Sequence, residues 1–209
     1  MFLFSLLMTA TYELLIPGLR SWTVANKRSH VHQTALYALN RIARDLEASC
    51  VESVQVRTDF STDSESGQVE EASALSFLSA VDDKGEIHER TDGAIIWQRY
   101  EVIYLDAARH TLYVGQRPLQ YDDSDGLVMR LESYSPDPLD RPLARAVRRF
   151  SAEAAVDALA SSFSDPAAPV HTNPVTLKIE VRDDTETCTL TTAVDTALAG
   201  DSVDAAPQP

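Results

Sequence analysis

The chain has 209 residues and a mass of 23.0 kDa, enough for one sizeable domain or a smaller domain with an appendage. Its formal net charge of -14, from 32 Asp and Glu against 18 Lys and Arg, would repel a phosphate backbone and disfavours direct nucleic-acid binding. The apolar fraction of 44% is ordinary for a folded protein and excludes a wholly disordered chain.

Residues 1–16 are mostly apolar and open with MFLFSLLM. As a helix this block would be about 24 Å long, short of the roughly 30 Å hydrocarbon core of a bilayer. A secretory signal peptide fits poorly, because no basic residues precede the block and no small-residue cleavage site follows it. Two interpretations remain: a buried core helix, or the C-terminal half of a transmembrane helix whose beginning lies outside this sequence.

A second helical segment follows Pro17-Gly18, where we expect a kink because proline lacks an amide hydrogen and clashes with the preceding turn. Apolar residues then recur at helical spacing: Val24, Val31, Ala35, Leu39, Ile42 and Leu46. We therefore predict one long helix over about residues 1–50, kinked near Pro17. The basic residues beyond the apolar block would suit either a membrane surface or the solvated face of a soluble helix.

From residue 51 the apolar period changes to two, which predicts antiparallel strands. The expected strands cover residues 51–57, 75–81, 97–106, 111–116, 127–131, 147–154, 175–181 and 187–194. Residues 58–72 between the first two strands are acidic and are expected to form a solvated loop. The proline-rich residues 135–142 are expected to form a connection, since proline cannot donate to a strand ladder. The predicted fold class is α+β, with the long helix packed on an antiparallel β-sheet domain.

The two cysteines, Cys50 and Cys188, match neither a zinc pattern nor a CxxC redox motif. A disulfide between them would close a loop that spans most of the domain. In an oxidising compartment it would stabilise the fold by about 4–5 kcal/mol in the loop-entropy model. The alternative is two buried thiols that pack as small hydrophobic groups. Both interpretations place Cys188 inside, because it lies on the apolar face of a predicted strand.

The histidines do not form a metal-binding pattern. His30 and His32 would point about 200° apart on a helix and could not share an ion. The other three, His88, His110 and His171, fall in predicted turns or strand ends and are expected to be surface histidines.

Residues 122–126 (DDSDG) have the density of acids found in a calcium loop. However, the twelfth position of an EF-hand counted from Asp123 is Tyr134 rather than glutamate, so a solvated turn is favoured. The chain also lacks a nucleophile elbow, a phosphate loop and a dinucleotide fingerprint. We therefore expect no enzyme, no catalytic residues, no metal and no cofactor.

The order of the segments carries more information than any one motif. The apolar start MFLFSLLM is followed by two expected helical segments, residues 15–22 and 35–46. Three expected strand segments come after them, residues 75–79, 97–104 and 175–181. In this order the chain resembles the type IV pilin and pseudopilin superfamily, and especially the J-type minor pseudopilins of type II secretion. The resemblance implies a non-enzymatic subunit that joins a secretion or pilus filament, or its tip, through its N-terminal helix.

Before assembly, such a subunit is held in the inner (cytoplasmic) membrane by a single helix, with its domain on the extracytoplasmic side, and its partners are other minor pilins or pseudopilins. In members of this family a prepilin peptidase cleaves after a glycine that precedes a phenylalanine-like residue, and it N-methylates the new N-terminus. The fifth residue of the mature protein is glutamate. Phe2 and Phe4 lack the preceding glycine. We therefore expect the gene start to lie upstream, with roughly ten to twenty further residues that would also complete a membrane span.

These inferences divide the chain into three parts. Residues 1–22 are the expected apolar membrane or filament-core segment. Residues 23–196 form the expected pilin-like globular domain, including the amphipathic half of the helix. Residues 197–209 are acidic, small and proline-ended, and are expected to be a disordered tail. The alternative function is a soluble extracytoplasmic ligand-binding domain whose first helix packs on its own sheet.

Overall fold

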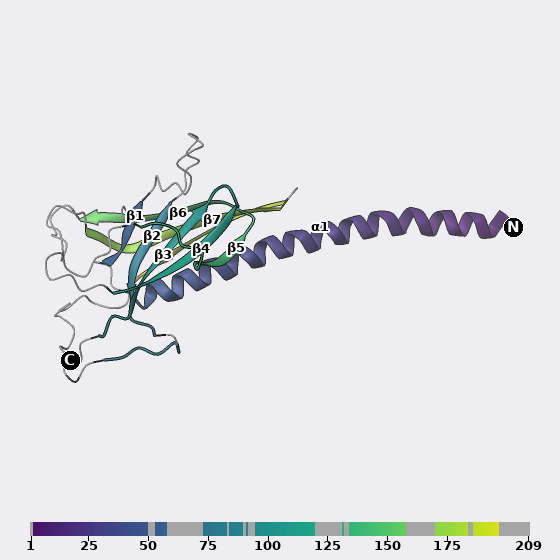
Figure 1. Ribbon diagram of the computed structural model, residues 1–209. Coiled ribbons are helices and arrows are strands. Elements are labelled where there is room, and N and C mark those ends of the chain that lie inside the picture. The colour runs from purple at the N-terminus through teal and green to yellow at the C-terminus, as the bar shows by residue number, and fades with distance from the viewer. Residues whose placement is uncertain are drawn as a thin grey trace.

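A computed structural model describes residues 2–49, 53–57, 73–82, 84–89, 91, 95–119, 131, 134–157, 170–183 and 186–196. These residues form one long helix, α1 (Phe2–Glu47), and two antiparallel sheets (Figure 1). The predicted α+β class, with a helix packed on antiparallel strands, is confirmed, although the strands form two sheets rather than one.

The chain passes through each sheet in sequence order, β1-β2-β3-β4-β5 and then β6-β7-β8. The strands are β1 (Gln55–Arg57), β2 (Ala74–Ser79), β3 (Arg99–Asp106), β4 (Thr111–Pro118), β5 (Arg141–Arg145), β6 (Val147–Asp157), β7 (Val170–Asp183) and β8 (Glu186–Val194). Both predicted hairpins are present, since β3 pairs with β4 and β7 pairs with β8. Their alternating apolar residues are local patterns, which explains why the sequence predicted them.

Helix α1 has 46 residues, which corresponds to a length of about 69 Å, and it continues through Pro17. Figure 1 shows α1 as one gently curved helix, without the sharp kink that the sequence predicted. The predicted apolar stripe is buried from Val31 onward, where the helix meets the sheets. Val24, at the start of the predicted stripe, is 48% exposed because it precedes that contact.

The main hydrophobic core is shared by α1 and by both sheets. The helix packs along β7 and β8 and also contacts β5 and β2. Its wholly buried residues Ile42 and Leu46 join a cluster with Phe77 of β2, Phe150 of β6 and Ile179 of β7. One apolar face of the C-terminal half of α1 therefore holds the two sheets together.

Strand β3 is buried on both faces, which differs from the half-exposed strand that alternation predicts. Ile103 faces the main core, while Tyr104 belongs to a second cluster and Tyr100 to a third. As a result Glu101, which lies between the buried residues Tyr100 and Val102, is itself only 1% exposed.

Residues 141–145 form the edge strand β5, whose first two residues fall in the segment 135–142 that was predicted to be a connection. Pro142 is tolerated because an edge strand needs hydrogen-bond partners on one side only. A register shift between Leu112 and Tyr113 interrupts the ladder to β4 at the same place. Arg141 and Arg145 at the two ends of β5 are exposed.

A tight corner carries the chain from the first sheet into the second. Ala146, between β5 and β6, has a φ of 60°, and His110, in the turn between β3 and β4, has a φ of 49°. Both conformations are uncommon for residues other than glycine. Two backbone hydrogen bonds of 2.9 Å hold the corner, from Val147 N–H to His110 C=O and from Arg182 N–H to Ala146 C=O.

Several predicted features fall outside the described residues: Cys50, the start of the 51–57 strand, the acidic loop 58–72, residues 122–130 with the calcium-like DDSDG segment and most of the 127–131 strand, and the tail 197–209.

Candidate functional surfaces and polar clusters

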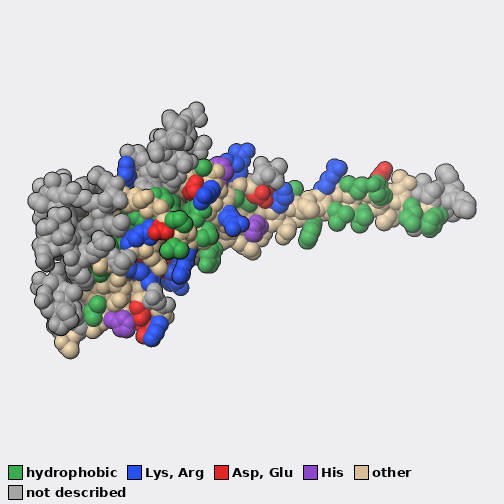
Figure 2. Space-filling view, in the orientation of Figure 1, with side chains coloured by type: hydrophobic (Ala, Val, Ile, Leu, Met, Phe, Trp, Pro, Cys, Tyr) green, Lys and Arg blue, Asp and Glu red, His purple; other side chains and the backbone are tan. Residues whose placement is uncertain are grey.

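The N-terminal half of α1 extends beyond both sheets (Figures 1 and 2). Six large apolar side chains on it are between 54% and 65% exposed: Phe4, Met8, Tyr12, Leu15, Leu19 and Trp22. Their spacings of four, four, three, four and three residues place them in one stripe along the helix. We call these six residues the projecting stripe.

The projecting stripe and the core-facing stripe lie on roughly opposite sides of α1, as the angles between their positions at 3.6 residues per turn show. Glu13, Arg20 and Lys27, spaced seven residues apart, lie off the projecting stripe, about 105–145° around the helix from its centre. The helix can therefore pack along its projecting stripe without the domain blocking the contact.

Within the part of the chain that the structure describes, no helix combines the length and apolarity needed to cross a membrane.

A groove of about 630 Å³ lies where α1 meets β5 and the end of β7. Its lining is His30, Val31, Gln33, Thr34, Tyr37, Pro142, Leu143, Ala144, Arg145, Ala146, Val181 and Asp183. This mainly apolar lining, with one acid, one arginine and one histidine, resembles a packing surface more than a set of convergent catalytic groups.

Cys188 of β8 is a free, half-buried thiol packed against the main core. Its Sγ lies 3.5 Å from Nδ1 of His32, which the sequence had not linked to it. Because Cys50 lies outside the described residues, the disulfide with Cys188 and the alternative of two packed thiols both stay predictions.

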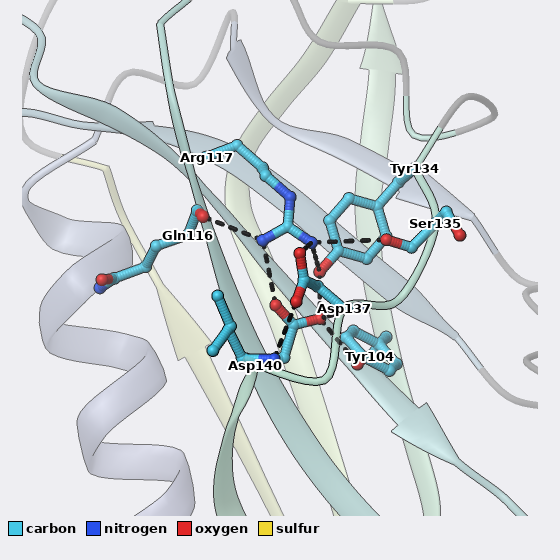
Figure 3. Close-up of polar contacts among 8 residues, drawn as sticks. Tyr104, Gln116, Arg117, Tyr134, Ser135, Asp137 and Asp140 are labelled. Carbon is cyan, nitrogen blue, oxygen red and sulfur yellow. Dashed lines mark hydrogen bonds and ion pairs between the residues drawn. The ribbon is translucent and has the colours of Figure 1, made fainter.

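The most connected polar group is the Asp140 cluster, formed by Tyr104, Arg117, Tyr134 and Asp140 (Figure 3). Oδ2 of Asp140 accepts hydrogen bonds from the hydroxyls of Tyr134 at 2.6 Å and Tyr104 at 2.9 Å, and from the backbone N–H of Asp137 at 2.9 Å. Its Oδ1 accepts one from Nη1 of Arg117 at 3.0 Å. The Arg117 guanidinium also lies 4.9 Å from the centre of the Tyr134 ring.

The protonation states of this cluster follow from its contacts. Burial alone would raise the pKa of Asp140, but the surrounding hydrogen-bond donors outweigh it and hold the pKa below its ordinary value. Burial, followed by the hydrogen bond to Asp140, raises the pKa values of Tyr104 and Tyr134, so both remain protonated donors. The donors and acceptors of the cluster satisfy one another, so we interpret it as a structural fastening of residues 134–140 to β3 and β4.

Gly115 of β4 makes room for this fastening. A Cβ atom at this position would collide with the Tyr134 hydroxyl and approach Oδ1 of Asp140 to 2.9 Å. A glycine inside a strand often marks such a close approach. No local motif identifies the Asp140 cluster in the sequence, since Tyr104 and Asp140 are 36 residues apart.

A second buried acid, Glu101, faces the C-terminal end of α1. Its Oε1 accepts hydrogen bonds from Nε of Arg99 at 3.1 Å and Nε2 of Gln116 at 3.0 Å, while its buried Oε2 has no protein partner among the described contacts. Burial, followed by repulsion from Glu101, raises the pKa of Asp45 on α1. Arg41 opposes this shift through a 2.6 Å contact between its Nε and Asp45 Oδ2.

The structure distributes the five histidines over the domain. His30 lines the groove, His32 contacts Cys188, and His110 lies at the corner between the sheets. His88 is exposed, as expected, but it pairs with Asp82, a contact that the sequence analysis missed. His171 lies in β7, and its side chain is outside what the structure describes.

No family model, curated protein or solved structure matches the chain.

Proposed function

We propose that the chain is a non-enzymatic subunit of a helix-packed assembly of the kind formed by minor pilins and pseudopilins of type II secretion or type IV pilus systems. The observation that carries the proposal is the projecting stripe: six large apolar side chains, each more than half exposed, on one face of a helix that extends beyond its domain. An apolar surface of this extent in water is typical of an interface.

The orientation of the stripe supports packing between subunits. Because the stripe lies on the side of α1 away from the core-facing residues, neighbouring helices can meet there while the domains stay outside. Burying one large apolar side chain contributes about 1.5–3 kcal/mol, so a stripe of six gives a strong driving force for association. Glu13, Arg20 and Lys27 lie off the stripe and need not enter that contact.

Before assembly, the same stripe would be buried against the lipids of the inner membrane, with the domain on the extracytoplasmic side. The main rival is a soluble ligand-binding domain whose first helix packs on its own sheet. That function requires Met8, Leu15 and Leu19 to contribute to the core, whereas each is more than half exposed.

The stripe can be tested with the full chain in a mild detergent. We expect Leu15→Gln with Leu19→Gln to abolish oligomers seen by sedimentation, because both changes fall on the stripe. A matched control is Leu14→Gln with Val24→Gln, since these residues are also exposed but lie off the stripe. Equal effects of the two pairs would argue against a specific helix contact, and circular dichroism would verify that both variants fold.

The pilin version makes a further demand on the native protein. Mass spectrometry of the chain from its own cells should find a processed, N-methylated terminus, and small helix-anchored subunits should co-purify with it. An unmethylated terminus would exclude the processed pilin but would leave a helix-packed subunit possible.

A further inference from the structure

We infer that the short hairpin of residues 81–89 binds a divalent transition-metal ion through Asp82, Glu86 and His88. One carboxylate oxygen from each acid and one imidazole nitrogen lie within 4.8 Å of one another. The hairpin belongs to the teal coil below the sheets in Figure 1, and Figure 2 shows a histidine beside acidic side chains on that projection. The inference is independent of the function proposed above.

The backbone holds two of the three ligands in place. Val81 and Ile87 form an antiparallel bridge, and Asp82 N–H donates to Glu86 C=O at 3.0 Å. Gly85 completes the turn with a φ of 86°, a conformation that favours glycine. His88 is fixed at its own backbone, since its C=O accepts a hydrogen bond of 2.9 Å from Ile96 N–H.

The two oxygens of Asp82 have different tasks. Oδ1 accepts hydrogen bonds from the backbone N–H groups of Lys84 at 2.8 Å and Glu86 at 2.9 Å. This leaves Oδ2 directed at Nε2 of His88, 3.0 Å away.

The donor set selects the class of ion. Two acids at a turn would not by themselves indicate a site, but the imidazole nitrogen adds a ligand that suits Zn²⁺, Co²⁺ and Ni²⁺ better than Ca²⁺ or Mg²⁺. Tetrahedral Zn²⁺ with ligands at about 2.1 Å places its donors about 3.4 Å apart. The Asp82–His88 pair already has nearly this spacing, and the exposed Glu86 side chain can rotate to reach it.

Calorimetry on the chelator-treated full chain in detergent tests the site with Zn²⁺ and, for comparison, Ca²⁺ salts. We expect one ion per chain, with affinity reduced more than about tenfold by His88→Ala or Glu86→Gln, since even changes behind a metal ligand cost about 10–100-fold. His30→Ala is the matched control, because His30 is exposed but lies in the groove.

A structural readout distinguishes this site from other metal binding. Zn²⁺ should slow hydrogen exchange at the amides of Glu86 and Ile96, whose hydrogen bonds hold the hairpin, and His88→Ala should remove the effect. Absence of saturable binding, equal loss in His30→Ala and His88→Ala, or preference for Ca²⁺ over Zn²⁺ would each overturn the inference. Circular dichroism of the variants excludes misfolding as the cause of a loss.

Discussion

The body of the domain and the projecting half of α1 place apolar side chains in opposite environments. Ile42 is wholly buried between the sheets, whereas Leu19, on the same helix, is 54% exposed. The two residues are chemically similar, so composition does not explain the difference. It arises because the sheets cover the helix only from Val31 onward.

This comparison distinguishes residues that stabilise the fold from residues that are available for association with other molecules. In the body, side chains such as Ile42 and those of the Asp140 cluster have partners within the chain, and their contacts should determine the free energy of unfolding. Among the described residues, the side chains of the projecting stripe are more than half exposed, and we propose above that a neighbouring molecule buries them.

The largest effect is expected from Ile42→Ala. This change leaves a cavity where the helix joins both sheets and should lower the free energy of unfolding by about 2–5 kcal/mol. Urea denaturation of the full chain in detergent, followed by circular dichroism, measures it. A loss below about 1 kcal/mol would mean that the helix is not part of the core and would break the comparison.

Asp140→Asn should cost somewhat less. The amide keeps one oxygen that can accept from the tyrosines or Arg117 but loses the charge, so we expect a loss of about 1.5–3 kcal/mol, the size of one hydrogen bond to a charged group. Urea denaturation at neutral pH measures the loss. Tyr104→Phe is a milder control, since it removes only one of the donors to Asp140.

The same variant makes a prediction about pH. Because the folded pKa of Asp140 is lowered, its charge stabilises the protein above the unfolded value near 3.9, and this contribution is lost as the pH falls through the folded pKa. The stability difference between the original chain and Asp140→Asn should therefore shrink in acid. A difference that stays constant between pH 7 and the acid range would contradict the charged role of Asp140.

Gly115→Ala should destabilise the body by about 1–3 kcal/mol, because its Cβ atom would meet the Tyr134 hydroxyl. Combining it with Tyr134→Phe should recover part of the loss, since the colliding oxygen is removed. A double-mutant cycle by urea denaturation measures this coupling. Strictly additive losses would show that the strand accommodates the methyl group without contact.

Local periodicity explains which parts of the fold the sequence could predict. The stripe from Val31 to Leu46 and the two hairpins repeat at helical or strand spacing, and the structure confirms them. Strand β5 was missed because Pro142 argued against a strand, and only its position at the sheet edge makes the proline acceptable. The burial of Glu101 was missed because alternation does not show that a second layer covers the other face of β3.

The candidate surfaces show the same limit. The sequence predicted an apolar membrane or filament-core segment over residues 1–22, but the relation between the projecting and core-facing stripes depends on where the domain packs on α1. The Asp140 and Asp82 clusters depend on turns and on strand pairing, which bring together residues without a recognised motif. Contacts of this kind cannot be predicted from local sequence patterns, because they form only when the folded chain brings distant residues together.

The smallest effect on stability is expected from Leu19→Ala. Because Leu19 lies on the exposed part of α1, its truncation should change the free energy of unfolding by less than about 0.5 kcal/mol. The same change should weaken oligomers of the full chain, since it removes apolar area from the projecting stripe. Sedimentation and urea denaturation on one preparation separate the two quantities. If Leu19→Ala lowered stability as much as Ile42→Ala, the projecting half of α1 would have to be packed within its own chain in solution, and the rival ligand-binding domain would become the better account.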